Sequence, residues 1–242
     1  MRYVIANWKQ NKTLDEAVSW LESFTRLLEN IDIKGVTPII CPPAPFLERM
    51  LFALKADFAA IRGVGRESGT RDENAAKSAT SVELGIQDIS PYADGAHTGF
   101  VGVNQVKQFC KYVLVGHSER QESRDLVMQK AEQCLSTNIV PIVCFKSSND
   151  YKIIDGAIYA LEDPDNISVG GVYRPKNLQD VVILVDTARK FFGQESVLVY
   201  GGSVNGENAQ DLASIKNLNG VLVGNASLSP VEFADIVRKF SL

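Results

Sequence analysis

The sequence is poor in histidine and cysteine, with two residues of the first type and four of the second among 242. Zinc sites need clusters of these side chains at characteristic spacings. The cysteines form no CxxC pair and show no metal-ligand spacing, so we expect no bound metal. Three of them lie in apolar stretches, as small buried thiols do, which favours a reducing, cytoplasmic location.

Long apolar stretches and an excess of basic residues are also missing. No stretch approaches the roughly 20 apolar residues that span a membrane, and Met1 leads directly into a strand-like run without a signal peptide. Lysine and arginine number 25 against 29 acidic residues, which gives a net charge of −4. This balance argues against binding to nucleic acid or to a membrane surface, although it permits a local positive site for a small anion.

What the sequence does contain is a regular alternation of short apolar runs with helical patterns. The eight runs are residues 3–6, 36–41, 82–87, 113–115, 139–145, 157–161, 196–200 and 220–223. Their order predicts an α/β fold, a (β/α)₈ barrel in one domain over residues 1–242, because such barrels need about 250 residues. An open, doubly wound sheet shows the same alternation and is the alternative. No G-x-G-x-x-G follows the first run, which disfavours a dinucleotide cofactor.

Three segments need separate interpretation. Residues 62–80 are rich in glycine, serine and charged residues, which predicts a polar, solvated insertion with at most a short helix at 73–77. Residues 149–154 form at most a short helix. Within residues 176–192, the run Val181–Val185 could pass for a strand, but the length of the whole pattern favours a helix.

One stretch, Tyr112 to Arg120, combines a buried strand with polar side chains. Its apolar run stops at Gly116, and His117, Ser118 and Glu119 follow at once. His117 would therefore sit at the carboxyl end of a strand, where ligands bind in parallel sheets and barrels, and Ser118 could cap a helix. A histidine that only serves the core explains this stretch equally well.

Other strand ends carry polar groups that would meet His117 at one face of the barrel. They are Asn7, Lys9, Gln87, Glu119, Glu162, Ser203, Gly224 and Asn225. The glycine turns after the seventh and eighth runs suit a phosphate, because exposed N–H groups at helix starts favour an anion. A carboxylate base, an imidazole and a fixed phosphate suggest proton abstraction beside the carbonyl of a small phosphorylated sugar. Taken singly, Lys9 could be a surface lysine and Glu162 a structural carboxylate.

Five stretches, taken in order, resemble motifs of the triosephosphate isomerase family. They are residues 7–11 (NWKQN), 95–99 (GAHTG), 115–120 (VGHSER), 200–204 (YGGSV) and 222–228 (LVGNASL). The resemblance implies interconversion of dihydroxyacetone phosphate and D-glyceraldehyde 3-phosphate through an enediol(ate), a step of glycolysis and gluconeogenesis, without a cofactor. It also implies a homodimer, with a tetramer as the alternative, in which Thr98 reaches the neighbouring active site.

The same resemblance, and not the residue pattern, implies the individual catalytic roles. Glu162 would carry the proton between the two carbons, and His117 would act as a neutral electrophile on the carbonyl. Asn7 and Lys9 would stabilise the enediolate oxygens, and Glu119 would hold Lys9 or the local backbone.

The phosphate-binding residues implied by the resemblance are Ser168, Ser203, Gly224 and Asn225, together with Asn7 and Lys9. The lid segment departs from the family pattern, because Asp163 replaces a proline and Ser168 replaces a glycine. These two changes motivate the alternative of a non-catalytic sugar-phosphate-binding barrel with an impaired lid. Another phosphate-binding barrel isomerase or epimerase is a third hypothesis, which lacks metal-ligand histidines.

Overall fold

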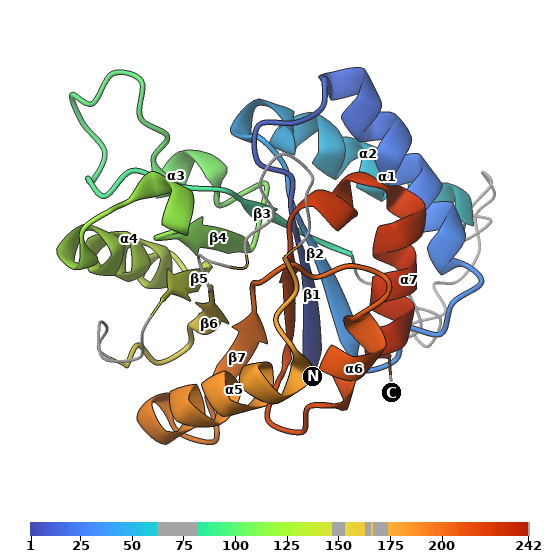
Figure 1. Ribbon diagram of the computed structural model, residues 1–242. Coiled ribbons are helices and arrows are strands. Elements are labelled where there is room, and N and C mark those ends of the chain that lie inside the picture. Colours follow the sequence, from blue (N-terminus) through green and yellow to red (C-terminus); the bar gives the residue numbers. More distant parts are fainter. Residues whose placement is uncertain (62–81, 147–152, 163–165, 167–173, 242) are drawn as a thin grey trace, which may run out of the picture.

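The computed structural model describes residues 1–61, 82–146, 153–162, 166 and 174–241 (Figure 1). Within them, eight parallel strands form a closed barrel in sequence order, and β8 pairs with β1 to complete it. This closure confirms the predicted barrel and excludes the open sheet. The predicted insertion at 62–80, with its helix at 73–77, lies outside the described residues, as do most of the lid segment and residues 149–152.

The strands are β1 (Arg2–Asn7), β2 (Val36–Cys41), β3 (Glu83–Ile86), β4 (Tyr112–Val115), β5 (Val140–Phe145), β6 (Ile158–Leu161), β7 (Val197–Tyr200) and β8 (Gly220–Val223). The α-helices are α1 (Leu14–Leu28), α2 (Leu47–Ile61), α3 (Val103–Val106), α4 (Arg124–Ser136), α5 (Leu178–Phe192), α6 (Ala209–Ser214) and α7 (Pro230–Phe240). The short 3₁₀ helices are η1 (Ala44–Phe46), η3 (Ser118–Arg120) and η6 (Asn225–Leu228). All eight predicted runs are strands, and the ambiguous run Val181–Val185 is helical, as its length indicated.

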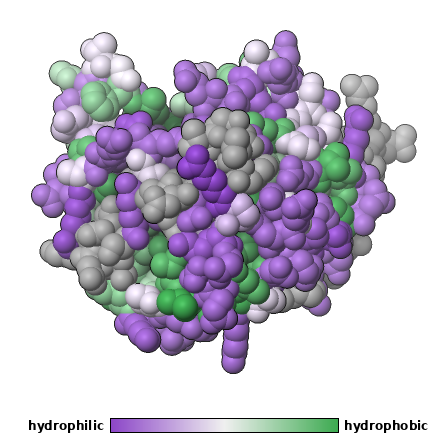
Figure 2. Space-filling view, viewed as in Figure 1, coloured by the Kyte–Doolittle hydropathy of each residue, from purple (hydrophilic) through white to green (hydrophobic). Residues whose placement is uncertain are grey.

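The surface in the view of Figure 2 is mostly hydrophilic, and its hydrophobic residues form small, separate patches. No helix in the described ranges is both long and apolar enough to cross a membrane. All four cysteines are buried and free.

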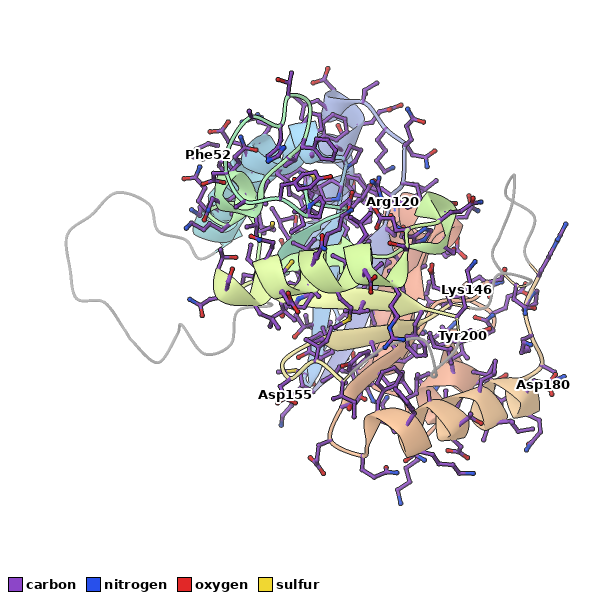
Figure 3. All side chains as sticks on the ribbon, turned by 90° about the vertical axis from the view of Figure 1, so that its left-hand side faces the viewer. Phe52, Arg120, Lys146, Asp155, Asp180 and Tyr200 are labelled. Carbon is purple, nitrogen blue, oxygen red and sulfur yellow. The ribbon has the colours of Figure 1, made fainter. Side chains whose placement is uncertain are left out.

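The carboxyl ends of the strands open toward one side of the molecule. Figure 3 shows Arg120, Lys146 and Tyr200 on the side toward which the strand arrows point, whereas Asp155 lies toward the other end. These three residues follow or end β4, β5 and β7. The polar residues predicted at strand ends therefore belong to one face of the barrel.

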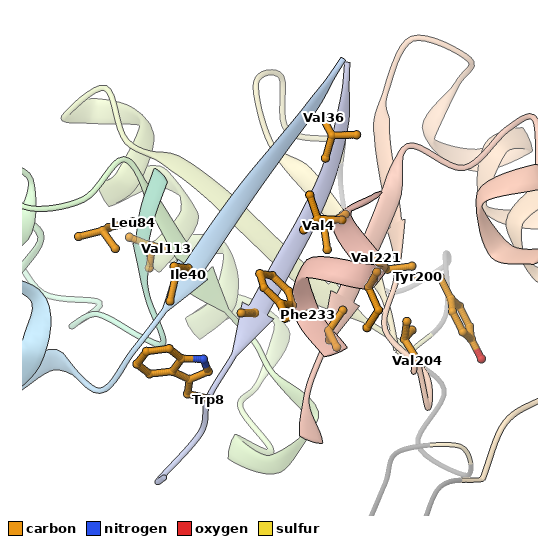
Figure 4. Close-up of a cluster of buried hydrophobic side chains, with 14 of the residues drawn as sticks. Val4, Trp8, Val36, Ile40, Leu84, Val113, Tyr200, Val204, Val221 and Phe233 are labelled. Carbon is orange, nitrogen blue, oxygen red and sulfur yellow. The ribbon is translucent and has the colours of Figure 1, made fainter. Parts of the chain in front are cut away.

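Two hydrophobic layers hold the barrel together. The inner layer fills the barrel with Ile5, Ile39, Cys41, Leu114, Ile142, Cys144, Ile158, Ala160, Val199 and Leu222. The outer layer joins the strands to the helices, and Figure 4 shows part of it, including Val4, Ile40 and Val113. Because neighbouring residues of a strand point to opposite faces, Val4 belongs to the outer layer and Ile5 to the inner one. A near-continuous apolar strand thus fills both layers.

Side chains cap the first and the last α-helix. Thr13 and Glu16 form the full capping box of α1, with the Thr13 N–H donating to Glu16 Oε2 at 2.7 Å. Ser229 caps α7, but the carboxylate of Glu232 accepts from the N–H of Gly206 at 3.2 Å. Glu232 thus ties α7 to the loop before α6, and only the Ser229 half of a capping box is present.

One local prediction is wrong. We expected Ser118 to cap a helix, but the cap of η3 is His117, whose ring accepts the N–H of Glu119. Asn208 is the residue before α6, and Asn205 caps the turn that leads into this helix, because its Oδ1 accepts the Asn208 N–H at 3.0 Å. On α4, Leu135 is exposed, and the buried face of the helix includes Lys130.

Candidate active site

Strand alternation places two of the predicted residues at the mouth of the barrel. Asn7 follows Ile5 in the inward series of β1, and Glu162 follows Ile158 and Ala160 in that of β6. The ladder between β5 and β6 extends one residue further, because the Glu162 N–H donates to the Phe145 carbonyl at 2.9 Å. The strands themselves therefore fix where the side chains of Asn7 and Glu162 begin.

His117 enters the site through a turn that requires glycine. Gly116 has φ +74°, and a Cβ at this position would lie 2.8 Å from Val127 Cγ2, so both backbone and packing exclude a side chain. His117 Nδ1 accepts the Glu119 N–H at 3.3 Å. A nitrogen that accepts this bond carries no proton, so the proton of the neutral ring lies on Nε2. The Glu119 carboxylate is 3.7 Å from Nδ1, beyond hydrogen-bonding distance.

Glu162 is buried and directed at the same turn. Its Oε1 lies 3.0 Å from His117 Nε2, and its Oε2 accepts the Ser118 N–H at 2.8 Å. The Cys144 thiol lies beneath it, where burial and the charge of Glu162 raise the pKa of the thiol well above its usual value. Carboxylate and imidazole thus meet at one point, with the Nε2–H of the ring between them.

Lys9 is held on three sides in an unusual conformation. Its φ of 53° is left-handed, which costs a non-glycine residue about 1–3 kcal/mol. The Lys9 N–H donates to Asn7 Oδ1 at 3.1 Å, and its carbonyl accepts from Gln87 Nε2 at 2.9 Å. Its Nζ forms an ion pair with Glu119 Oε1 at 2.5 Å. These contacts direct one ammonium group into the mouth.

A small cavity of about 30 Å³ brings most of the predicted site residues together. Its lining consists of Asn7, Lys9, His117, Glu162, Gly201, Gly202, Val204, Leu222, Gly224 and Asn225. A Cβ on Gly202 would collide with the Tyr200 hydroxyl, and one on Gly224 would lie 3.8 Å from Lys9 Cε. Three glycines of the turns after β7 and β8 thus line the cavity beside Lys9.

Glu119, Ser168 and Ser203 are predicted site residues that are not among those lining this cavity. Ser168 lies outside the described residues. The hydroxyl of Ser203 is buried, accepts the Arg174 N–H at 2.9 Å and donates to the Asn166 carbonyl at 2.6 Å. In this structure the Ser203 hydroxyl therefore links Asn166 to Arg174, and its side chain does not line the cavity.

A larger, open pocket of about 780 Å³ adjoins the site. Asn7, Lys9, His117 and Glu119 are among its lining residues, and so are Thr98, Gly99 and Phe100 from the loop after β3. No group of three or more histidine, cysteine, aspartate or glutamate side chains is placed to hold a metal ion in the part of the chain that the structure describes. The chemistry available here is that of a base, a neutral donor, an ammonium group and backbone amides.

A protein-family model described as triosephosphate isomerase matches residues 2–65, 68–153 and 147–240 of the sequence. The chain belongs to the triosephosphate isomerase family. The triosephosphate isomerase of Aquifex aeolicus is 30% identical over 99% of this chain and 99% of its own length. That of Dehalococcoides mccartyi is 31% identical over 99% of this chain and 97% of its own length. The triosephosphate isomerase of Polynucleobacter necessarius is 28% identical over 97% of this chain.

Membership in the triosephosphate isomerase family agrees with the order of the five motifs found in the sequence.

The polar residues at the strand ends did not indicate one further group beside the site. Asp88, Arg120, Glu122 and Lys130 form a charged network behind the turn that carries His117. A signal was present in the sequence, because Lys130 is three residues from Val127 and beside Ala131 on the buried face of α4. A lysine at such a position needs acidic partners.

Proposed function

We propose that this chain is a triosephosphate isomerase enzyme that interconverts dihydroxyacetone phosphate and D-glyceraldehyde 3-phosphate, as in glycolysis and gluconeogenesis. The observation that carries the proposal is the 3.0 Å contact between His117 Nε2 and Glu162 Oε1 at a mouth that also contains Lys9 and two glycine turns. Family membership supports it, and no cofactor is needed for a proton transfer between neighbouring carbons.

Glu162 is the proposed base and His117 the proposed electrophile. The substrate carbonyl oxygen takes the place of Glu162 Oε1 on the Nε2–H of His117, which releases the carboxylate toward the carbon next to the carbonyl. Glu162 removes a proton there and returns it to the neighbouring carbon. The donor can be the neutral ring, because the Glu119 N–H already occupies Nδ1. Negative charge that develops on the oxygen is then stabilised by a hydrogen bond fixed in advance.

Lys9 and Asn7 are proposed to bind the enediolate oxygens and the phosphate. The ammonium of Lys9 brings positive charge to a chain of net charge −4, and Glu119 keeps it oriented. Phosphate contacts are assigned to Ser168, to the turn at Ser203, and to Gly224 and Asn225, the last two lining the cavity beside Lys9. Backbone N–H groups at such turns suit a dianion.

The decisive experiment is a coupled isomerase assay. We expect Glu162→Gln to lower kcat by about 10²–10⁴-fold, because it removes the proton carrier. Glu195→Gln, on the exposed loop before β7, is the matched control and should retain wild-type turnover. Wild-type protein that binds a substrate analogue but does not turn over substrate would instead support the non-catalytic barrel.

We further propose a homodimer that works in the cytoplasm, with residues 1–242 as one barrel domain. The loop between β3 and α3 projects from the body of the molecule (Figure 1). It carries a cluster in which Tyr92 stacks on His97 at 4.4 Å and meets Phe100 edge-on at 5.6 Å, and about half of Tyr92 and Phe100 is exposed. Such a cluster is suited to burial against a partner chain. The four free thiols support the cytoplasmic location.

Sedimentation analysis tests the oligomer. The double variant Tyr92→Ser/Phe100→Ser should shift the protein toward the monomer, whereas Phe52→Ser, which alters an equally exposed ring on α2, should not. A tetramer, or a wild-type monomer, would overturn the homodimer without touching the assignment of the reaction.

A further inference from the structure

Four charged side chains form a closed network behind the turn that follows β4. Lys130 Nζ lies 2.5 Å from Asp88 Oδ1 and 2.6 Å from Glu122 Oε1. Arg120 contacts the same two carboxylates, with Nη2 at 2.8 Å from Asp88 Oδ2 and Nε at 2.9 Å from Glu122 Oε1. Two cations thus share two anions, and the charges balance.

The network is enclosed on the side of α4. The side chain of Lys130 is 2% exposed and that of Glu122 is 6% exposed. An ammonium group at such depth is retained only with paired, hydrogen-bonded carboxylates, and removing it leaves a buried charge uncompensated. Arg120 is half-exposed, on the side toward which the strands point (Figure 3). Lys130 is therefore the inner cation that keeps the two carboxylates together.

The members of the network are chain neighbours of residues that position Lys9. Asp88 follows Gln87, whose amide donates to the Lys9 carbonyl. Arg120 follows Glu119, whose carboxylate accepts from Lys9 Nζ and whose N–H binds the ring of His117. A shift of Asp88 or Arg120 would also move Gln87 or Glu119, because one peptide unit joins each pair of neighbours.

We propose that Lys130 is a positioning residue for the reaction assigned above. By neutralising Asp88 and Glu122 between the carboxyl ends of β3 and β4, it fixes the turn that holds His117 and Glu119. Lys130 does not touch the substrate. The inference rests on the proposed function for its kinetic consequence, but its structural content concerns only the position of the imidazole.

The two histidines of the chain permit a direct test by NMR of the imidazole nitrogens. His117 lies at the turn, whereas His97 is stacked on Tyr92 in the projecting loop and serves as an internal control. A His97→Gln variant assigns the two signals. In Lys130→Met we expect the His117 nitrogen shifts to move while those of His97 stay in place.

Lys111→Met is the matched control variant. Lys111 also pairs with an acidic residue of β3, Glu83, at 2.5 Å, but at the amino end of the same strand pair. We expect it to leave both histidine signals and the turnover at wild-type values. Lys130→Arg, which keeps the charge, should return the His117 signal and most of the activity.

The kinetic expectation is a loss in kcat larger than any change in KM. Lys130→Met should lower kcat by about tenfold or more, toward the roughly 100-fold that a 1 Å misplacement of catalytic groups can cause. If Lys130→Met does not fold, Glu122→Gln/Lys130→Met removes one charge of each sign, and the same shift of His117 and the same direction in kcat are expected.

Folded Lys130→Met, or the double variant in its place, with the wild-type His117 signal and wild-type kcat would overturn the inference. Equal losses for Lys130→Met and Lys130→Arg, with His117 unmoved, would also overturn it, because they would indicate a purely structural role. A further outcome is wild-type protein without turnover whose His117 signal moves in Lys130→Met and stays in place in Lys111→Met and Lys130→Arg. In that case the proposed function fails and the positioning of the imidazole stands.

Discussion

The two ends of the β3–β4 pair carry charges in opposite ways. At the amino end, Lys111 pairs with Glu83 in solvent, and the lysine side chain is 68% exposed. At the carboxyl end, Lys130 is enclosed between Asp88 and Glu122. Surface pairs contribute little to stability, whereas breaking a buried pair leaves an uncompensated charge. Within this strand pair, the enclosed lysine thus lies at the end that carries His117, where the proposed electrophile must keep a fixed position.

The largest expected difference between the two ends is in turnover. Lys9→Met removes the cation at the carboxyl-end mouth. It should lower kcat/KM by about 10²–10³-fold, because the ammonium group stabilises charge that develops in the reaction. Lys111→Met removes a cation at the other end and should change kcat/KM by less than about twofold. The coupled isomerase assay measures kcat/KM for both variants. Similar losses would contradict the expected difference between the two ends of the barrel.

The second difference is in the free energy of unfolding. Lys130→Met should lower it by about 3–5 kcal/mol, because two enclosed carboxylates are left with one half-exposed partner. Lys111→Met should lower it by about 0–1 kcal/mol. Urea unfolding followed by circular dichroism measures both values. A loss below about 1 kcal/mol for Lys130→Met would show that solvent reaches the network.

Two glycines with positive φ allow a further comparison of the two ends of the barrel, with a smaller expected difference in stability. Gly116 precedes His117 with φ +74°, and a Cβ there would lie 2.8 Å from Val127. Gly193 follows α5, toward the amino end of β7, with φ +86° and nothing within 4 Å of an added Cβ. Gly116→Ala should destabilise by about 2–3 kcal/mol and lower kcat, whereas Gly193→Ala should cost about 1 kcal/mol and leave kcat unchanged. Equal effects in urea unfolding would mean that packing at Gly116 adjusts freely.

The smallest expected effect is a dependence of stability on alkaline pH. Burial raises the pKa of Cys110, just before β4, and of Cys134, on α4, to about 12 each. Above pH 9 the unfolded chain releases thiol protons that the native state retains, so stability should fall as pH rises from about 9 toward 12. Each thiol contributes about 0.4 kcal/mol at pH 9, and its contribution grows as the pH rises. Cys110→Ala/Cys134→Ala should therefore show a flatter decline of the urea midpoint between pH 8 and pH 10, and an identical decline would contradict the assignment.

The sequence predicts the barrel and much of the site because both follow from local patterns. The inward series that ends in Asn7 and the series that ends in Glu162 need only the two-residue period of a strand and the position where the apolar run stops. His117 is found in the same way, from the end of the run at Gly116. The roles given to these residues remain proposals.

The remaining features depend on contacts across the sheet that no local pattern specifies. Ser118 is a residue type that often caps helices, yet the ring of His117 forms the capping bond, because the turn brings its Nδ1 to 3.3 Å from the Glu119 nitrogen. Lys130 lies on a predictable helix face, but its pairing with Asp88 depends on how α4 sits against the end of β3. The position of a helix relative to a strand end is fixed only when the chain folds.

The bond from the Glu119 N–H to His117 Nδ1 has an evolutionary consequence. The donor is a main-chain group, so nineteen of the twenty residue types at position 119 would still supply it, and only proline would not. The tautomer of the ring is thus insulated from side-chain substitution at its nearest neighbour. Drift at this position can alter the orientation of Lys9 while the imidazole keeps its proton on the same nitrogen.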